Sequence, residues 1–282
     1  MTQPQPRVVL VDGVPMSALV AAVPTPRAVL VAVHGGATTA AYFDCPGHPR
    51  LSLVRSAAAH GYTVIALDRP GYGASALYAE EFDDTERRVG FALGAVDRIL
   101  ADSDRGAGLF LMGHSAGCEL ALRLAVARDV VGVELAGTGL RYHRDARAVI
   151  KQATYTARPG LRDLLWQPTS LYPAEVLTSG LSAPGVAYEM EVTTHWATRD
   201  FSALAGRVTA PVQFSVAEHE AVWETTPEAI ASIVALFSAA PGIHVNEVAD
   251  AGHNISVGLS ADVYHGRVLA FADECIARRR AA

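Results

Sequence analysis

The sequence has only three cysteines, a single lysine and no long apolar run. Cys45, Cys118 and Cys275 are scattered and odd in number, which excludes a disulfide framework and a Cys-x-x-Cys metal site. A net charge of −6 lacks the basic footprint of a nucleic-acid binder. No apolar stretch reaches the roughly 20 residues that span a bilayer, and the N-terminus has no secretory signal pattern. These absences predict a cytoplasmic protein with no membrane segment and no nucleic-acid partner.

The composition is that of a globular protein, with half of the 282 residues apolar and 18% charged. This length suits one large domain, or one domain that carries an insertion. Arginine supplies nearly all of the positive charge and alanine is abundant, a bias that suggests a GC-rich bacterial genome. The sequence offers no Gly-rich nucleotide loop and no metal-ligand set, so we expect no cofactor and no metal.

Short apolar runs alternate with segments of helical periodicity along most of the chain. Strands are predicted at 7–11 and 14–20 around an Asp12-Gly13 turn, and at 28–33, 62–67, 109–112, 130–135, 211–216 and 243–248. Helices are predicted at 51–60, 80–101, 116–128, 227–239 and 257–278. Such alternation is typical of βαβ units, so we predict an α/β fold with a mostly parallel, doubly wound sheet.

The alternation lapses between residues 138 and 207, which are rich in proline, arginine and aromatic residues. This stretch is too long for a simple loop. We predict a mainly helical cap inserted into one α/β core. Residues 1–137 then form the first part of that core, and residues 208–282 form the second.

The pentapeptide Gly113-His114-Ser115-Ala116-Gly117 fits Gly-x-Ser-x-Gly and lies between a predicted strand and a predicted helix. A serine on so sharp a turn has a strained backbone that projects its hydroxyl out of the sheet. The crowded turn admits only small neighbours, which accounts for the two glycines. The helix that follows places the N–H of Ala116 beside the hydroxyl. Ser115 is therefore the predicted nucleophile.

A serine hydroxyl is a poor nucleophile until a base removes its proton. The candidate base is His253, in the loop Ala251–Asn254 that follows the last predicted strand. An acid should orient the imidazole, and the loop after the 211–216 strand offers Glu218 and Glu220. We favour Glu220 and keep Glu218 as the alternative.

An oxyanion site needs two N–H donors directed at the developing negative charge. Ala116 is expected to supply one. The other should come from His34-Gly35-Gly36-Ala37, where glycine lets the backbone approach a substrate closely. Gly36 is the first choice for this donor and Ala37 the second. His34 is expected to stabilise the loop, and the side chain of His114 to point away from the serine.

Taken in order, these elements resemble the α/β-hydrolase superfamily over nearly the whole chain outside the cap. The resemblance rests on His34-Gly35-Gly36, the Asp68–Ser75 loop, Gly113–Gly117 and Gly252-His253-Asn254. It implies a structural role for the Asp68–Ser75 loop and the cleavage of an ester, thioester, amide or lactone. Family members usually carry Asp where this chain has Glu220. Members with an Asp nucleophile, such as haloalkane dehalogenases and epoxide hydrolases, are disfavoured because position 115 is serine.

We therefore expect a hydrolase that cleaves a carboxylic ester or thioester of a small molecule through an acyl-enzyme on Ser115. Acyl transfer, lyase action and C–C bond hydrolysis can use the same residues and remain alternatives. A non-catalytic ligand-binding member of the fold is a further alternative, which the complete set of catalytic elements disfavours.

The resemblance also implies that the cap supplies much of the substrate pocket. Aromatic side chains give large apolar contact areas, and Trp166, His195 and Trp196 are the candidates. The alternative is that the two tryptophans simply pack the cap onto the core.

The cap also carries a group of arginines with two possible roles. They either contact an anionic group, such as the phosphate of a carrier-bound substrate, or form a solvated helix face. The group consists of Arg141, Arg144, Arg147 and Arg158.

Overall fold

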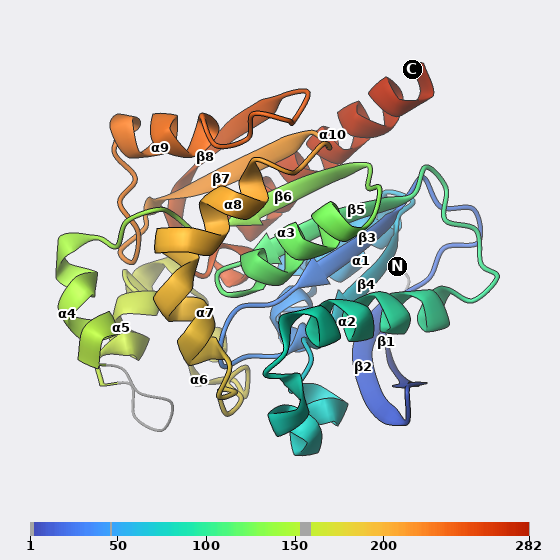
Figure 1. Cartoon of the computed structure of the whole chain (residues 1–282), viewed down its shortest axis with the longest axis horizontal. Helices are drawn as coiled ribbons and strands as arrows, with labels where there is room; N and C mark the ends of the chain where they lie inside the picture. Colours follow the sequence, from blue (N-terminus) through green and yellow to red (C-terminus); the bar gives the residue numbers. More distant parts are fainter. Residues whose placement is uncertain (1–2, 46, 153–158, 282) are drawn as a thin grey trace.

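The computed structural model describes residues 3–45, 47–152 and 159–281. Its centre is an eight-stranded sheet with the order β1-β2-β4-β3-β5-β6-β7-β8 (Figure 1). β2 pairs antiparallel with β1 and β4, and all the other neighbours are parallel. The predicted mostly parallel, doubly wound sheet is confirmed. The strands are β1 (Gln5–Val11), β2 (Val14–Ala21), β3 (Val29–Val33), β4 (Thr63–Leu67), β5 (Leu109–His114), β6 (Gly132–Ala136), β7 (Val212–His219) and β8 (Ile243–Gly252).

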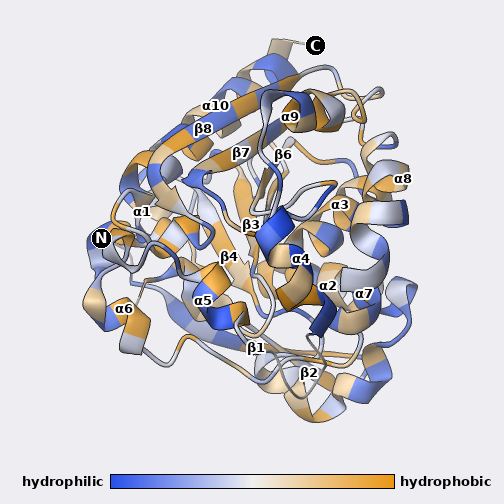
Figure 2. Cartoon of the chain, turned by 90° about the vertical axis from the view of Figure 1, so that its left-hand side faces the viewer, coloured by the Kyte–Doolittle hydropathy of each residue, from blue (hydrophilic) through white to orange (hydrophobic). Residues whose placement is uncertain are grey.

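Helices cover both faces of the sheet. α1 (Leu53–Ala59) and α10 (Ala261–Ala281) pack on one face, and α2 (Thr85–Leu100), α3 (Gly117–Ala127) and α9 (Pro227–Val234) pack on the other. Every residue of β3, β4 and β5 is buried, because the helices shield both sides of these apolar strands. Figure 2 shows the apolar strands enclosed between the helical layers. No helix in the described ranges has both the length and the apolar character needed to cross a bilayer.

Short helical turns connect these elements. They lie at Ala40–Phe43, Pro49–Leu51, Gly73–Phe82 and Ile255–Val257. The turn at Gly73–Phe82 shortens the helix predicted at 80–101, which begins only at Thr85. The physical reason is Asp84, whose carboxylate accepts the N–H of Arg87 at 2.7 Å and caps the helix.

β7 and β8 are longer than the strands predicted at 211–216 and 243–248. They end at His219 and Gly252, so that Glu220 and His253 each follow a strand directly. Because the two strands are parallel neighbours, both residues come out at the same edge of the sheet.

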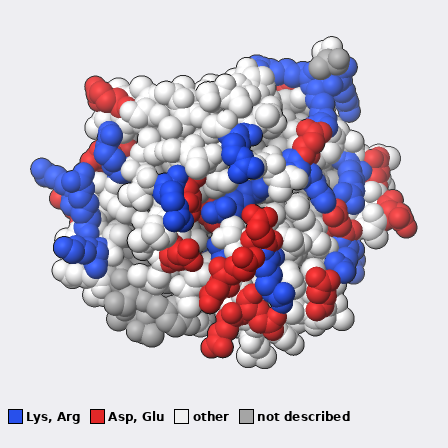
Figure 3. Space-filling model, in the orientation of Figure 1, with Lys and Arg blue, Asp and Glu red and all other residues white. Residues whose placement is uncertain are grey.

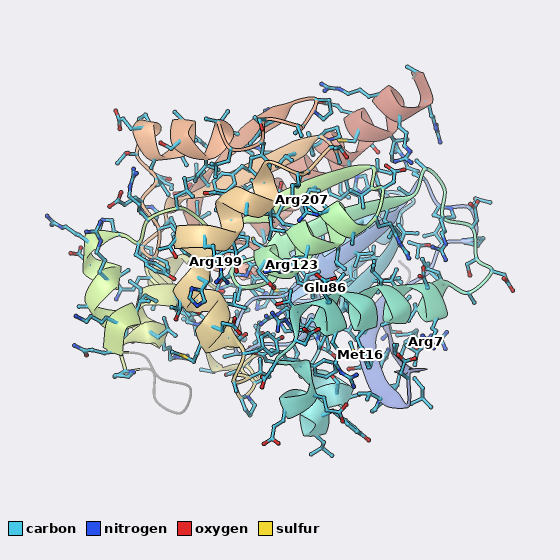
Figure 4. All side chains as sticks on the ribbon, in the orientation of Figure 1. Arg7, Met16, Glu86, Arg123, Arg199 and Arg207 are labelled. Carbon is cyan, nitrogen blue, oxygen red and sulfur yellow. The ribbon has the colours of Figure 1, made fainter. Side chains whose placement is uncertain are left out.

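Residues 138–207, called the insertion below, lie between β6 and β7 along the chain and are mainly helical in the described part, as predicted. Their helices gather on the side of the sheet where the parallel strands end, with α4 and α5 in front in Figure 2. Asp200 ties the insertion to α3, since its carboxylate accepts a hydrogen bond from Arg123 of α3 at 3.4 Å. Figure 4 labels Arg123 and Arg199, which lie where α3 meets the insertion. The insertion contains α4 (Arg144–Gln152), α5 (Leu161–Leu165), α6 (Ala174–Thr178), α7 (Glu189–His195), α8 (Phe201–Ala205), a turn at Thr169–Leu171 and a π-helical turn at Trp196–Asp200.

Candidate active site

Ser115 occupies a tight turn between β5 and α3. Its φ is 52°, in the left-handed region that residues other than glycine rarely adopt. A Cβ on Gly113 would lie 2.8 Å from the Cα of Cys118, and a Cβ on Gly117 would lie 2.3 Å from the carbonyl oxygen of Val33. Close packing of the turn therefore requires both glycines, and it holds the strained serine in place.

Ser115, His253 and Glu220 form a continuous hydrogen-bonded chain. Nε2 of His253 lies 3.1 Å from Oγ of Ser115, and its Nδ1 lies 2.9 Å from each carboxylate oxygen of Glu220. The side chains of His253 and Glu220 are only 1% and 4% exposed. When Nδ1 carries its proton toward the carboxylate, Nε2 can accept the proton of the serine hydroxyl. This is the arrangement that general-base catalysis requires.

Glu218 and Glu220 point to different places. The carboxylate of Glu218 accepts the backbone N–H of Asp250 at 2.8 Å, and its side chain is 54% exposed. The pairing of β7 with β8 shifts register just after Ala217, and the N–H of Glu220 turns back to the Ala217 carbonyl at 3.1 Å. This turn directs Glu220, and not Glu218, at His253.

Gly36, Ala37 and Ala116 line the same cavity as Ser115. The N–H of Ala37, however, donates to the hydroxyl oxygen of Tyr72 at 3.0 Å. Within the described residues, the N–H groups of Gly36 and Ala116 make no hydrogen bond to the protein. The prediction of Ala37 as a second choice of donor is thus corrected, because its N–H already has a partner. Among the described residues, the N–H groups of Gly36 and Ala116 remain without a protein partner at the cavity wall.

Two buried histidines beside the serine hold loops in place. Nδ1 of His34 donates to the Gly35 carbonyl at 2.8 Å, and its Nε2 accepts the backbone N–H of Arg69 at 3.0 Å. Nε2 of His114 donates to the carbonyl of His253 at 2.8 Å, a link that the sequence did not predict. Burial lowers the pKa of His34 well below its usual value and that of His114 to about 3. Both rings are therefore neutral near pH 7.

A cavity of about 390 Å³ lies over Ser115, between the sheet edge and the insertion. Trp166 and Trp196 line it. Tyr142 and Trp223 form another part of the wall, with their rings stacked at a centroid distance of 4.4 Å. Trp223 is not among the residues that the sequence predicted for the pocket. The available signal was an aromatic side chain three residues after the candidate acid, in a loop that must face the same site.

His195 does not line the cavity. On α7 and the turn that follows, the lining residues are Glu189, Val192, Thr193 and Trp196. These positions recur every three or four residues and therefore share one face of the helix. His195 falls outside that face, which corrects its prediction as a substrate-binding residue.

The arginine group of the insertion is engaged in exposed ion pairs. Arg141 and Arg147 both contact Glu224, at 2.8 and 2.7 Å, and Arg144 contacts the adjacent aspartate at 3.2 Å. Arg158 lies outside the described residues. Figure 3 shows basic side chains gathered over α4, which supports the interpretation as a solvated face. In the described part of the chain, no three His, Cys, Asp or Glu side chains are grouped so as to hold a metal ion.

The insertion touches each of the three loops that carry the site. One contact joins it to the loop of Gly36, one to the loop of His253 and one to the loop of Glu220. They are Thr38 Oγ1 to the Leu181 carbonyl at 2.7 Å, the Asn254 N–H to the Tyr172 hydroxyl at 3.2 Å, and the His143 N–H to the Val222 carbonyl at 2.8 Å.

Comparison with known proteins identifies the family. A family model for the alpha/beta hydrolase family matches residues 30–265. The chain belongs to this family. A search of curated protein sequences finds no match.

Solved structures with the same fold include three of different stated activities. E-2-(acetamidomethylene)succinate hydrolase has a TM-score of 0.67 and 19% identity, and the match covers 96% of this chain and 100% of that one. A thermostable carboxyl esterase from Bacillus coagulans has a TM-score of 0.66 and 15% identity, with 98% and 100% covered. The thioesterase domain from the curacin biosynthetic pathway has a TM-score of 0.63 and 15% identity, with 95% and 99% covered. At these identities the likeness concerns the fold alone.

Proposed function

We propose that this chain is a serine hydrolase that cleaves a carboxylic ester, thioester or lactone of a small molecule through an acyl-enzyme on Ser115. The observation that carries the proposal is the hydrogen-bonded chain from Ser115 through His253 to Glu220. Its serine end lines the same cavity as Gly36 and Ala116, whose N–H groups have no protein partner in the described residues. These residues supply a nucleophile, a base, an acid that orients the base, and two donors for the oxyanion.

In the first half of the reaction, Oγ of Ser115 attacks the substrate carbonyl carbon while Nε2 of His253 takes the hydroxyl proton. The carboxylate of Glu220 stabilises the imidazolium that forms. The N–H groups of Gly36 and Ala116 donate to the oxyanion, where fixed donors contribute most in a site shielded from water. The imidazolium then protonates the leaving alcohol or thiol as the C–O or C–S bond breaks.

In the second half, a water molecule replaces the leaving group. Nε2 of His253 takes one of its protons, and the resulting hydroxyl attacks the acyl carbon of the ester on Ser115. The same two N–H groups stabilise the second oxyanion. Its collapse breaks the bond to Oγ, releases a carboxylic acid and returns the proton to the serine.

The cavity supports an acyl group that is largely apolar and of modest size. Its volume of about 390 Å³ lies at the low end of the range for small-molecule sites, and Trp166, Trp196 and Trp223 supply aromatic wall. We further propose that the insertion, residues 138–207, is a cap over a core made of residues 1–137 and 208–282. The solved structures with the same fold include both a carboxyl esterase and a thioesterase domain, so the fold accommodates an alcohol or a thiol as the leaving group.

A fluorophosphonate probe tests the proposal directly, because it forms a stable covalent adduct with an activated serine. Intact-mass measurement of the wild type should show the mass of one adduct, and Ser115→Ala should show none. Circular dichroism of the variant checks that its fold is retained. A folded wild type that gains no adduct would mean that Ser115 is not an activated nucleophile.

A further inference from the structure

A carboxylate of the insertion reaches the loop that carries the oxyanion donor. Glu189, at the start of α7, is 3% exposed, and one of its oxygens accepts the hydroxyl of Tyr72 at 2.6 Å although the two residues are 117 positions apart. The same oxygen pairs with the guanidinium of Arg69, which is itself buried. Tyr72 and Arg69 both belong to the Asp68–Ser75 loop, so Glu189 joins that loop to the insertion.

The segment Gly35–Ala37, called the oxyanion loop below, is hydrogen-bonded to both partners of Glu189. Nη2 of Arg69 donates to the Gly35 carbonyl at 2.8 Å. The hydroxyl oxygen of Tyr72 accepts the N–H of Ala37 at 3.0 Å. Burial raises the pKa of Tyr72 well above its usual value, so its hydroxyl keeps the proton that it donates to Glu189.

Because the peptide unit is planar, these hydrogen bonds also determine the direction of the Gly36 N–H. The carbonyl of Gly35 and the N–H of Gly36 belong to one rigid trans unit and point in opposite directions. Arg69 fixes this carbonyl together with Nδ1 of His34, which donates to the same oxygen at 2.8 Å, and the two donors thereby fix where the N–H points. Tyr72 fixes the next peptide unit in the same way through the N–H of Ala37. The Gly36 donor therefore lies between two anchored groups.

Charge and space require that these residues act together. A Cβ built on Gly36 would lie 3.3 Å from both carboxylate oxygens of Glu189, so the carboxylate lies directly against the loop. An unneutralised negative charge there would oppose a developing oxyanion, and Arg69 offsets it. Removing either member of a buried ion pair leaves the other charge uncompensated, which is strongly unfavourable.

We propose that Glu189 is a positioning residue which, through Tyr72 and Arg69, sets the direction of the Gly36 N–H, so that the insertion completes the oxyanion site. This inference rests on the proposed function, because it assigns the effect to the transition state of acyl transfer. Glu189 itself touches neither the serine nor the reacting carbonyl in this mechanism. It acts through the loop.

The primary test compares Tyr72→Phe with Tyr188→Phe. Both tyrosines are buried and both hydroxyls are hydrogen-bonded, but that of Tyr188 donates to the Pro70 carbonyl at 2.8 Å and has no bond to the oxyanion loop. With p-nitrophenyl butyrate, Tyr72→Phe should lower kcat about 10- to 100-fold, less than the loss of a whole oxyanion donor, with KM within about threefold of wild type. Tyr188→Phe should keep kcat within about twofold of wild type, with a similar fall in the unfolding temperature.

A second readout separates positioning from general loosening of the fold. A trifluoromethyl ketone forms an oxyanion-like adduct with the serine, so its affinity should fall by the same factor as kcat/KM in Tyr72→Phe. Glu189→Gln, which removes the charge but nearly keeps the shape, should show the same parallel fall. If Glu189→Gln does not fold, Tyr72→Phe decides alone.

The possible failures are distinguishable. If the wild type hydrolyses the ester and takes the fluorophosphonate label, but Tyr72→Phe matches Tyr188→Phe in kcat, the positioning role of Glu189 is overturned and the proposed function stands. A rise of KM with unchanged kcat in Tyr72→Phe would overturn it too. If the wild type takes no label, the proposed function fails and this inference fails with it.

Discussion

Nε2 of His114 donates a hydrogen bond to the carbonyl oxygen of His253 at 2.8 Å, so the residue before the nucleophile holds the loop of the base. The ring of His114 is in turn stacked on Tyr42 at a centroid distance of 4.6 Å. The distance between serine and imidazole is therefore fixed by a short path through adjacent residues. The acid lies on a separate loop, and its identity can be tested independently.

Glu220→Gln should lower kcat by about two to four orders of magnitude, because the amide cannot stabilise the imidazolium and favours the wrong tautomer of His253. Glu218→Gln is the matched control, since the carboxylate of Glu218 is half exposed and accepts the backbone N–H of Asp250 instead of contacting His253. Its kcat should stay within about twofold of wild type. Initial rates on p-nitrophenyl butyrate give both values, and a larger loss in Glu218→Gln would show that the acid is misassigned.

Trp166→Ala should shift acyl-chain preference toward longer chains, because it removes a large side chain from the cavity wall. The ratio of kcat/KM for p-nitrophenyl octanoate to that for the butyrate should rise about 10-fold, the effect of one or two additional buried methylene groups. His195→Ala, a change on the same insertion but off the cavity, should leave the ratio within about twofold. Equal ratios in the two variants would place the acyl group elsewhere.

Gly90→Ala should raise the free energy of unfolding by about 0.5–1 kcal/mol, because alanine is the better helix former and nothing lies within 4 Å of the new methyl group. Gly94→Ala, one turn later in α2, should gain little or lose stability, since its methyl would lie 2.9 Å from Cγ1 of Val11. Urea unfolding of both variants measures the difference. Equal gains would mean that the contact between α2 and β1 yields easily.

His265→Leu should remove part of the acid sensitivity of the fold. His265 is 1% exposed, neither ring nitrogen has a partner within the described residues, and burial lowers its pKa to about 3. Below the usual pKa of about 6.5 the unfolded chain binds a proton that the native state excludes, so stability falls as pH drops from about 6.5 toward 3. The variant lacks this loss.

The advantage of His265→Leu over wild type should therefore grow by about 1 kcal/mol for each pH unit below about 6.5 and stay constant above about pH 7.5. Urea unfolding at about pH 8, 6 and 5 measures it across this window. A difference that stays the same over the whole range would show that His265 is not excluded from protonation in the native state.

The sequence predicted the fold and the neighbourhood of Ser115 because these depend on local patterns. Apolar runs mark buried strands, and Gly113 and Gly117 are explained by a turn that five residues define. The position of His253 follows from strand order. Glu220 could be preferred to Glu218 from the sequence, but the choice depends on a register shift between β7 and β8 that leaves no pattern in the chain.

Other parts of the site depend on contacts between distant residues. Ala37 is a reasonable second candidate in sequence, and only the hydroxyl of Tyr72, 35 positions away, occupies its N–H. His195 is a plausible pocket residue from its ring alone, but it lies outside the face of α7 that lines the cavity. Glu189 and Arg69 are 120 positions apart in the sequence, so no local sequence pattern could predict their pairing. Packing, and not residue type, decides these roles.

The contacts between the insertion and the loops of Gly36, His253 and Glu220 restrict the ways in which the substrate range of such a chain can change. If recombination replaced the insertion by that of a distant relative, the residues that line the cavity would change. The hydrogen bonds from the insertion to the three loops would be lost at the same time. Single substitutions on the cavity side of α7, at Val192 or Thr193, alter the wall and leave those hydrogen bonds in place. New specificities in this lineage should therefore arise through point changes rather than through segment exchange.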